Sequence, residues 1–128
     1  MAKRKSQLTK AETQVMQCLW QLADMQGTSA EVMAQMPEPK PALTTLLTFL
    51  KILTEKGYVR TERKGKSNLF TALVSHDDYA SEVVSDVKDS FFGGSFASLV
   101  SFFAQREQLS DTEIDELINL IKTGGVKV

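Results

Sequence analysis

Apolar residues near the start of the chain recur every three or four positions. This spacing places them on one face of an α-helix and predicts a helix over residues 9–26. Thr9, followed three residues later by Glu12, has the pattern of a capping box and predicts where this helix begins. Gly27 is expected to follow its end. The apolar stripe of the helix consists of Val15, Met16, Leu19, Trp20 and Leu22.

Two further helices are predicted on either side of a proline-rich connector. The short second helix is expected to begin at Thr28 or Ser29 and to end at the connector, residues 37–41. Proline fixes its own backbone and restricts the residue before it, so the connector cannot be helical throughout. The third helix is predicted over residues 42–56, with Pro41 expected in its first turn.

After the third helix the pattern changes to two short runs in which apolar and polar residues partly alternate. These runs, residues 58–62 and 69–74, are predicted as β-strands. The segment between them, residues 63–68, is polar and contains a glycine, which predicts a hairpin turn with a basic tip. Three helices followed by a basic hairpin are the elements of a winged helix-turn-helix domain.

The remainder of the chain returns to helical spacing. Residues 76–128 are predicted to form three amphipathic helices, interrupted at Gly93-Gly94 and restarted by a second capping box at Ser110 and Glu113. The expected fold is therefore mainly α with a small β-hairpin wing (α+β). We expect a winged-helix DNA-binding domain in residues 1–75 and a helical dimerisation domain in residues 76–128.

The third helix has a face that suits DNA. At about 100° per residue, its apolar side consists of Leu43, Leu46, Phe49, Leu50 and Leu53, and its exposed side of Thr44, Thr48, Lys51 and Glu55. Threonine hydroxyls can contact phosphates or base edges, and the threonine methyl can meet a thymine methyl. Leu47 and Ile52 lie at the margins, where they either pack on neighbouring helices or contact thymine methyls. Both interpretations stay open at this point.

In a winged helix the third helix enters the major groove and the hairpin lies against the DNA backbone. Cations of the hairpin would then meet phosphates, in the salt-sensitive part of binding. The basic start of the chain, Lys3, Arg4 and Lys5, is either an arm toward DNA or a tail without such a role. The residues expected to contact DNA are Thr44, Thr45, Leu47, Thr48, Lys51, Arg63, Lys64 and Lys66.

The C-terminal helices are too few to bury a secure core of their own, and aromatic residues are concentrated in them. A second copy of the chain would complete their burial in a two-fold dimer that reads two half-sites. The alternative is that they pack back on their own winged helix. The residues expected at the dimer contact are Tyr79, Val83, Val87, Phe91, Phe96, Leu99, Val100, Phe103, Leu117 and Ile121.

Charge is distributed unevenly along the 128 residues. The net charge is −1, but residues 1–75 contain 11 Lys and Arg against 6 Asp and Glu, while residues 76–128 contain 4 against 10. Such asymmetry is expected when one half meets phosphate and the other does not, although surface charge can also divide this way by chance. The asymmetry favours double-stranded DNA as a partner of the first half.

Other function classes lack the residues they need. One cysteine, Cys18, and one histidine, His76, give no disulfide, metal cluster or nucleophile–base pair, and no glycine-rich phosphate loop is present. We expect no enzyme activity, no metal and no cofactor. The basic start is followed by Ser6 and Gln7 where a signal peptide would be apolar, so a cytoplasmic location is expected. A winged helix that binds proteins rather than DNA is the alternative function, but it would have no need of a basic wing.

The order of these motifs resembles the penicillinase repressor family of bacteria, which includes β-lactam-responsive repressors and a copper-responsive branch. The resemblance extends from Leu8 to Lys122 and rests on Leu8-Thr9-Lys10-Ala11-Glu12, Val15-Met16, Leu19-Trp20, Thr44-Thr45-Leu46-Leu47-Thr48, Lys56-Gly57-Tyr58-Val59, Phe92-Gly93-Gly94-Ser95-Phe96, Ser98-Leu99-Val100, Leu109-Ser110, Glu113-Ile114 and Glu116-Leu117. It implies a homodimeric repressor that binds a palindromic operator and dimerises through its C-terminal helices.

The resemblance also implies a way to relieve repression. In the β-lactam branch, the metalloprotease activity of a membrane sensor leads to cleavage within the helix that corresponds to residues 99–103, which places the bond here at Ser101–Phe102. The family often has Asn before this Phe, and some relatives have Arg where Leu47 or Ile52 stands here. The copper branch senses its metal with cysteines near the C-terminus, and this chain has none after Cys18.

Overall fold

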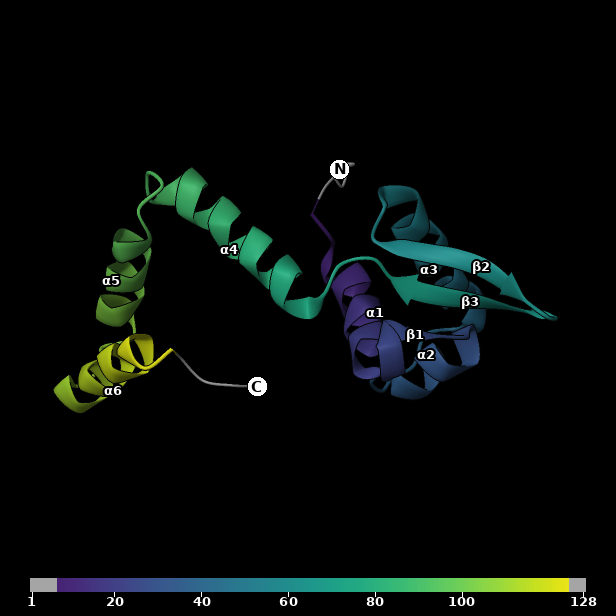
Figure 1. The fold of residues 1–128 in the computed structure, drawn as a ribbon, viewed down its shortest axis with the longest axis horizontal. Coiled ribbons are helices and arrows are strands. Elements are labelled where there is room, and N and C mark those ends of the chain that lie inside the picture. Colours follow the sequence, from purple (N-terminus) through teal and green to yellow (C-terminus); the bar gives the residue numbers. More distant parts are fainter. Residues whose placement is uncertain (1–6, 125–128) are drawn as a thin grey trace. The chain divides into compact units, whose positions relative to one another are not determined.

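Residues 7–124 are described by a computed structural model, in which six α-helices and a small sheet follow one another along the chain (Figure 1). The basic start at Lys3, Arg4 and Lys5 lies outside the described residues. The chain divides into two compact units, Met1–Val83 and Val84–Val128. The fold class is the expected one, mainly α with a β-hairpin wing. Within residues 7–124, no helix is both long enough and apolar enough to cross a membrane.

The first helix, α1 (Lys10–Gln21), begins at the predicted capping box. The Thr9 amide donates to Glu12 Oε1 at 3.0 Å, and the Glu12 amide donates to Thr9 Oγ1 at 3.2 Å. The helix ends five residues earlier than expected, and a short 3₁₀ turn, η1 (Ala23–Met25), follows. Asp24 and Met25 have positive φ angles there, which turns the chain back toward the sheet.

An unpredicted strand, β1 (Gln26–Gly27), follows this turn and pairs with the hairpin. A Cβ atom at Gly27 would lie 2.6 Å from Leu22 Cδ1, so a larger residue there would require the Leu22 side chain to move. Gly27 therefore belongs to the sheet, and the expectation that it ends the first helix is wrong.

The second and third helices form the helix-turn-helix. The helix α2 (Ser29–Gln35) begins with a capping box formed by Thr28 and Glu31, and α3 (Leu43–Lys56) ends at Gly57, whose φ of 89° is the left-handed conformation expected there. Ala42 precedes α3 without a side-chain cap. Pro41 thus lies before the helix rather than in its first turn, because the connector stays extended up to Ala42.

The hairpin consists of β2 (Val59–Lys64) and β3 (Ser67–Ala72), which pair in antiparallel fashion from Val59 opposite Ala72 to Lys64 opposite Ser67. The strands extend further toward the tip than predicted, and Gly65 turns the chain there with a positive φ. The sheet order is β1-β3-β2, which places β3 in the centre.

The interior of the first unit contains side chains from all three helices and the sheet. Its core residues are Val15, Met16, Cys18, Leu19, Val32, Met36, Leu46, Leu50, Leu53, Tyr58, Val59, Phe70, Ala72, Val74 and Tyr79. Tyr79 belongs to the helix α4 (His76–Phe91), so the first turns of α4 complete this core. The expected domain boundary after residue 75 falls at the start of α4, whereas the first unit continues to Val83.

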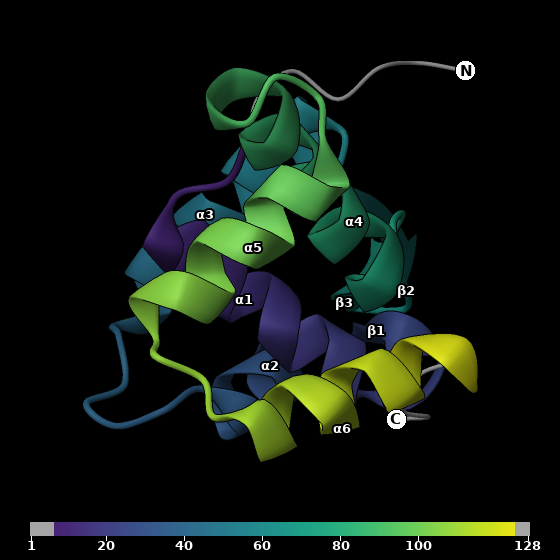
Figure 2. The same ribbon diagram turned by 90° about the vertical axis from the view of Figure 1, so that its left-hand side faces the viewer.

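The second unit contains the rest of α4 and two more helices, α5 (Phe96–Arg106) and α6 (Asp111–Lys122). Gly93 and Gly94 end α4 with positive φ angles, and the predicted capping box at Ser110 begins α6. Figures 1 and 2 show α5 and α6 as separate helices joined by a short linker. Among residues 84–124, Leu99 is the one apolar side chain that is buried.

Candidate nucleic-acid interface

The helix α3 presents a polar face to solvent and an apolar face to the core. Leu46, Leu50 and Leu53 are fully buried, and the side chains expected to contact DNA from this helix are all exposed: Thr44, Thr45, Leu47, Thr48 and Lys51. The Thr48 hydroxyl donates to the Thr44 carbonyl at 2.9 Å. Its oxygen can still accept a hydrogen bond, and the residue is exposed.

The apolar residues at the margins of this face differ in exposure. Leu47 is 39% exposed, whereas Ile52 is half-buried. Leu43 was expected on the apolar side of the helix and is 52% exposed instead. It occupies the first position of the helix. The exposed face of the first two turns therefore contains leucine as well as threonine.

The wing carries the expected cations at its tip. Arg63, Lys64 and Lys66 are exposed, and Arg63 Nε donates to the Gly65 carbonyl at 3.2 Å, which holds this arginine along the turn. Arg60 is a further exposed cation on β2, 3.8 Å from Glu62 Oε1, a surface ion pair of small energy. Arg60 was not among the expected residues, although strand alternation from Val59 to Lys64 would have placed it on the face shared with Lys64.

Two polar contacts fix the position of α3. Lys56 Nζ donates to Glu12 Oε1 at 2.8 Å and joins the end of α3 to the start of α1. The hydroxyl oxygens of Thr54 and Thr61 lie 2.8 Å apart and join α3 to β2. Neither contact was predicted, because their partners are far apart in the sequence or on different elements.

Among the described residues of this unit, Glu12 is the charged residue that is buried. Burial by itself would raise the pKa of its carboxyl group, but the hydrogen bond from Lys56, together with those from Thr9, lowers the pKa below its ordinary value. The ionised carboxylate therefore belongs to the folded unit, where it has a cation and an amide as partners.

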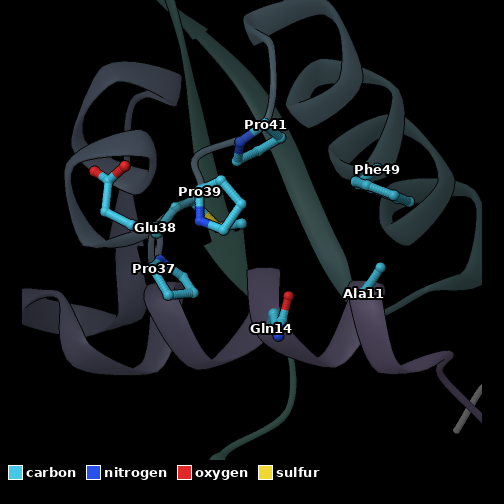
Figure 3. A pocket seen from close by; sticks show the side chains of 8 residues that line it. Ala11, Gln14, Pro37, Glu38, Pro39, Pro41 and Phe49 are labelled. Carbon is cyan, nitrogen blue, oxygen red and sulfur yellow. The ribbon is translucent and has the colours of Figure 1, made fainter.

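The connector between α2 and α3 is held by prolines and by one lysine. Lys40 Nζ donates to the Met33 carbonyl at 2.8 Å and to the Met36 carbonyl at 2.9 Å, so it satisfies carbonyl groups at the end of α2. A cavity of about 280 Å³ lies between α1, the connector and α3. Figure 3 shows Pro39 and Pro41 facing it from the connector and the Glu38 carboxylate pointing away.

Residues expected at the dimer contact have different surroundings. Tyr79 is buried in the first unit, where its hydroxyl accepts a hydrogen bond from the Leu8 amide at 3.0 Å, and Val83 packs against the same core. The burial of these two side chains is thus explained within one chain. Val87, Val100 and Leu117 are half-buried, Leu99 is buried, and four side chains are exposed by more than half: Phe91, Phe96, Phe103 and Ile121.

The exposed apolar surface of the second unit extends beyond the residues expected from the sequence. Four further apolar side chains are exposed: Val84, Phe102, Ile118 and Leu120. The bond between Ser101 and Phe102 lies inside α5, and both side chains are exposed. The ring of Phe102 lies 5.3 Å from that of Phe92 and 5.8 Å from the Arg106 guanidinium, centre to centre.

Cys18 and His76 show no arrangement for catalysis or metal binding. Cys18 is buried, its sulfur lies 3.4 Å from that of Met36, and burial raises the pKa of its thiol. His76 begins α4, with Nδ1 2.9 Å from Asp77 and its ring edge-on to Trp20. Within residues 7–124, no three His, Cys, Asp or Glu side chains are grouped so that they could hold a metal ion.

The sequence is similar to known proteins along nearly all of its length. The family model described as penicillinase repressor matches residues 8–123. The chain is 26% identical to the penicillinase repressor of Bacillus licheniformis over 94% of this chain and 93% of that protein. It is 27% identical to the methicillin resistance regulatory protein MecI of Staphylococcus aureus over 90% and 93% of the two chains. The chain belongs to the penicillinase repressor family.

Proposed function

We propose that this protein is a dimeric transcriptional repressor that binds a palindromic operator in double-stranded DNA. The observation that supports this most is the exposed threonine and lysine face of α3, followed directly by a wing with three cations at its tip. In a winged helix such a face enters the major groove while the wing meets phosphates. The printed names of the relatives, a penicillinase repressor and a methicillin resistance regulatory protein, support the same function.

The DNA-binding domain in this proposal is the winged helix of residues 1–75, with the first turns of α4 completing its core. Buried leucines on one side of α3 and the Lys56–Glu12 ion pair keep the helix in place, so the exposed side chains are presented from a rigid element. Thr44 and Thr45 supply hydroxyl groups to base edges or phosphates, and Lys51, Arg63, Lys64 and Lys66 supply positive charge.

Dimerisation is assigned to the C-terminal helices. Their exposed phenylalanines and isoleucines form an apolar surface that one chain leaves uncovered, as is typical of an interface between protein molecules. A second copy would cover the same surface on both chains in a two-fold arrangement. Two linked winged helices then bind two half-sites, and the linkage raises affinity without a new contact to DNA.

Relief of repression is proposed to follow cleavage between Ser101 and Phe102 through a membrane sensor with metalloprotease activity. Cleavage there would remove Phe102, Phe103 and α6 from the rest of the chain and so separate the two winged helices. Because the bond lies inside α5, a protease would need this helix to open locally. The protein would act in the bacterial cytoplasm, without a small-molecule cofactor and without enzyme activity of its own.

The test is binding of the full-length protein to its own promoter, measured by footprinting and by titration with salt. We expect protection of a two-fold symmetric site. The logarithm of the binding constant should fall linearly with the logarithm of the salt concentration. A variant with Arg63, Lys64 and Lys66 each replaced by glutamine should lower the slope by roughly 0.9 for each phosphate that the wing no longer neutralises. Lys122→Gln, on an exposed position of α6, is the matched control and should keep the slope.

Absence of DNA binding at low salt would contradict the proposal. It would favour the alternative, a winged-helix module that binds proteins and does not bind DNA. A variant that lacks all three wing cations and keeps the wild-type salt slope would contradict the role assigned to the wing.

A further inference from the structure

Two leucines on the outer surface of α3 have no role in the core. Leu43 is 52% exposed and Leu47 is 39% exposed, and they follow each other by one helical turn. They lie in the first two turns of the helix, the part that contacts base edges in helix-turn-helix proteins. Because these leucines are exposed, the surface that the first two turns of α3 offer to a binding partner is partly apolar.

The surroundings of the two leucines favour DNA over an apolar protein surface as that partner. Thr44, Thr48 and Lys51 are exposed on the same side of α3, and the one acidic residue of the helix, Glu55, lies in its last turn, away from the leucines of the first two turns. Thr54, on the margin shared with Leu47, is joined to Thr61 at the base of the cationic wing. Hydroxyl groups and one lysine therefore share the exposed side of the helix with the leucines, and such groups complement base edges and phosphates.

We propose that Leu43 and Leu47 determine operator specificity by contacting thymine methyl groups in the major groove. The 5-methyl of thymine is the apolar group that a base pair presents there, whereas cytosine presents an amino group that a leucine cannot satisfy. Ile52 has no part in this contact, because it is half-buried and lies in the second half of the helix. This inference rests on the proposed function and adds which bases the helix selects.

The spacing of the leucines sets the spacing of the thymines. Four residues of α-helix span about 6 Å along the axis, and successive base pairs are about 3.4 Å apart. Each half-site should accordingly contain two thymine methyls within about two base-pair steps of each other. Replacing leucine by a polar residue would remove this preference and leave the phosphate contacts unchanged.

The experiment uses the full-length protein and the duplex that it protects in its own promoter or, in parallel, one selected from random sequences. Each thymine of a half-site is replaced in turn by deoxyuridine, which lacks the methyl group and keeps the hydrogen-bonding edge. We expect affinity to fall roughly fourfold at each of two thymines in a half-site, which lie within about two base-pair steps of each other, and to stay unchanged elsewhere.

Three leucine variants identify the residues responsible. Leu43→Ala and Leu47→Ala should each abolish the thymine-to-uracil discrimination at one of these positions while still binding DNA. Leu73→Ala is the matched control, since Leu73 is 49% exposed but follows β3 outside the helix, and it should discriminate as the wild type does.

Equal affinity for thymine and deoxyuridine at every position would overturn the inference, and so would alanine variants that each keep the wild-type discrimination at both thymine positions. A protected half-site without thymine would also overturn it. All three results leave the repressor proposal intact. Failure to bind any duplex at low salt is the distinct outcome that would overturn the proposed function together with this inference.

Discussion

The two compact units of the chain bury their apolar residues to very different extents. In the first unit, three helices, the sheet and the start of α4 share one core, and the central leucines of α3 are completely buried. In residues 84–124, Leu99 alone is buried, while phenylalanines and isoleucines of α5 and α6 are exposed. Both regions are amphipathic in sequence, so the difference lies in whether the apolar faces find partners within one chain. The first unit has a core of its own, and the second leaves apolar side chains exposed, for which we proposed a second copy as partner.

The largest effect is expected from a cavity in the complete core. Leu50→Ala removes a fully buried side chain between α3 and its neighbours and should lower the free energy of unfolding by about 2–5 kcal/mol. Trp20, the one tryptophan of the chain, packs against this core and reports its unfolding through fluorescence. Leu73→Ala, at an exposed leucine of the same unit, should change the free energy of unfolding by less than about 0.5 kcal/mol. Equal losses from the two variants would contradict the division between core and surface.

The next effect concerns the surface that one chain leaves uncovered. Replacing Phe103 and Ile121 together by serine removes two side chains that are 53% and 64% exposed, so the fold of a single chain loses little. We expect the mass in light scattering to fall from two chains to one, and operator affinity to fall about 100-fold or more. Leu73→Ser controls for the loss of an exposed apolar residue in the first unit and should leave the dimer unchanged. A double variant that remains dimeric would show that the interface lies elsewhere.

A smaller effect, dependent on pH, is expected from the ion pair that joins α1 to α3. The pKa of Glu12 is lowered in the folded chain, so the ion pair stabilises fully above the unfolded-state pKa of glutamate, about 4.3, and less as the pH falls through the lower folded value. Glu12→Gln should lower unfolding free energy at pH 7 by about 1.5–3 kcal/mol and flatten its decline in acid. Lys56→Met should cost more, because it leaves a buried carboxylate without its cation. If the free energy of unfolding of Glu12→Gln falls in acid as much as that of the wild type, the Glu12 carboxyl is excluded as the cause of the fall.

The smallest effect compares similar capping boxes in the two units. Thr28 caps α2 in the first unit and Ser110 caps α6 in the second, each with a glutamate three residues later. Replacing either by alanine should cost about 1 kcal/mol. Thr28→Ala should lower the stability reported by Trp20, whereas Ser110→Ala should leave that signal unchanged and weaken the dimer about fivefold in sedimentation. The measurement is made at protein concentrations at which the chain is monomeric. If Ser110→Ala shifts the unfolding transition in Trp20 fluorescence there, the two units unfold together.

Much of the fold follows from local patterns in the sequence. The capping boxes at Thr9 and Ser110 predicted where two helices begin. Helical spacing predicted the burial of Leu46, Leu50 and Leu53 in α3. The strand β1 was missed because two residues have no pattern of their own and form a strand only by pairing with β3. Tyr79 was expected to face a partner, since spacing along α4 shows one apolar stripe but not that its first turns dock against Tyr58 and Trp20.

The exposure of the residues expected to contact DNA was predictable from the sequence, and the contacts that hold α3 in place were not. The exposed threonines of α3 and the wing cations followed from periodicity, whereas Lys56 and Glu12 are 44 positions apart and meet only in the folded chain. Leu43 was placed on the wrong side because periodicity assumes that every turn of a helix has neighbours. Leu43 stands in the first turn of α3 and is 52% exposed.

The central claim, that a complete winged helix binds DNA and an incomplete helical unit supplies the second copy, is tested most directly by one mass measurement. Native mass spectrometry of the full-length protein with the duplex protected in its own promoter gives the number of chains on each DNA molecule. We expect two chains per duplex across a titration, with no appreciable one-chain complex. A complex with a single chain that persists when protein is in excess, or no complex at low salt, would contradict the claim.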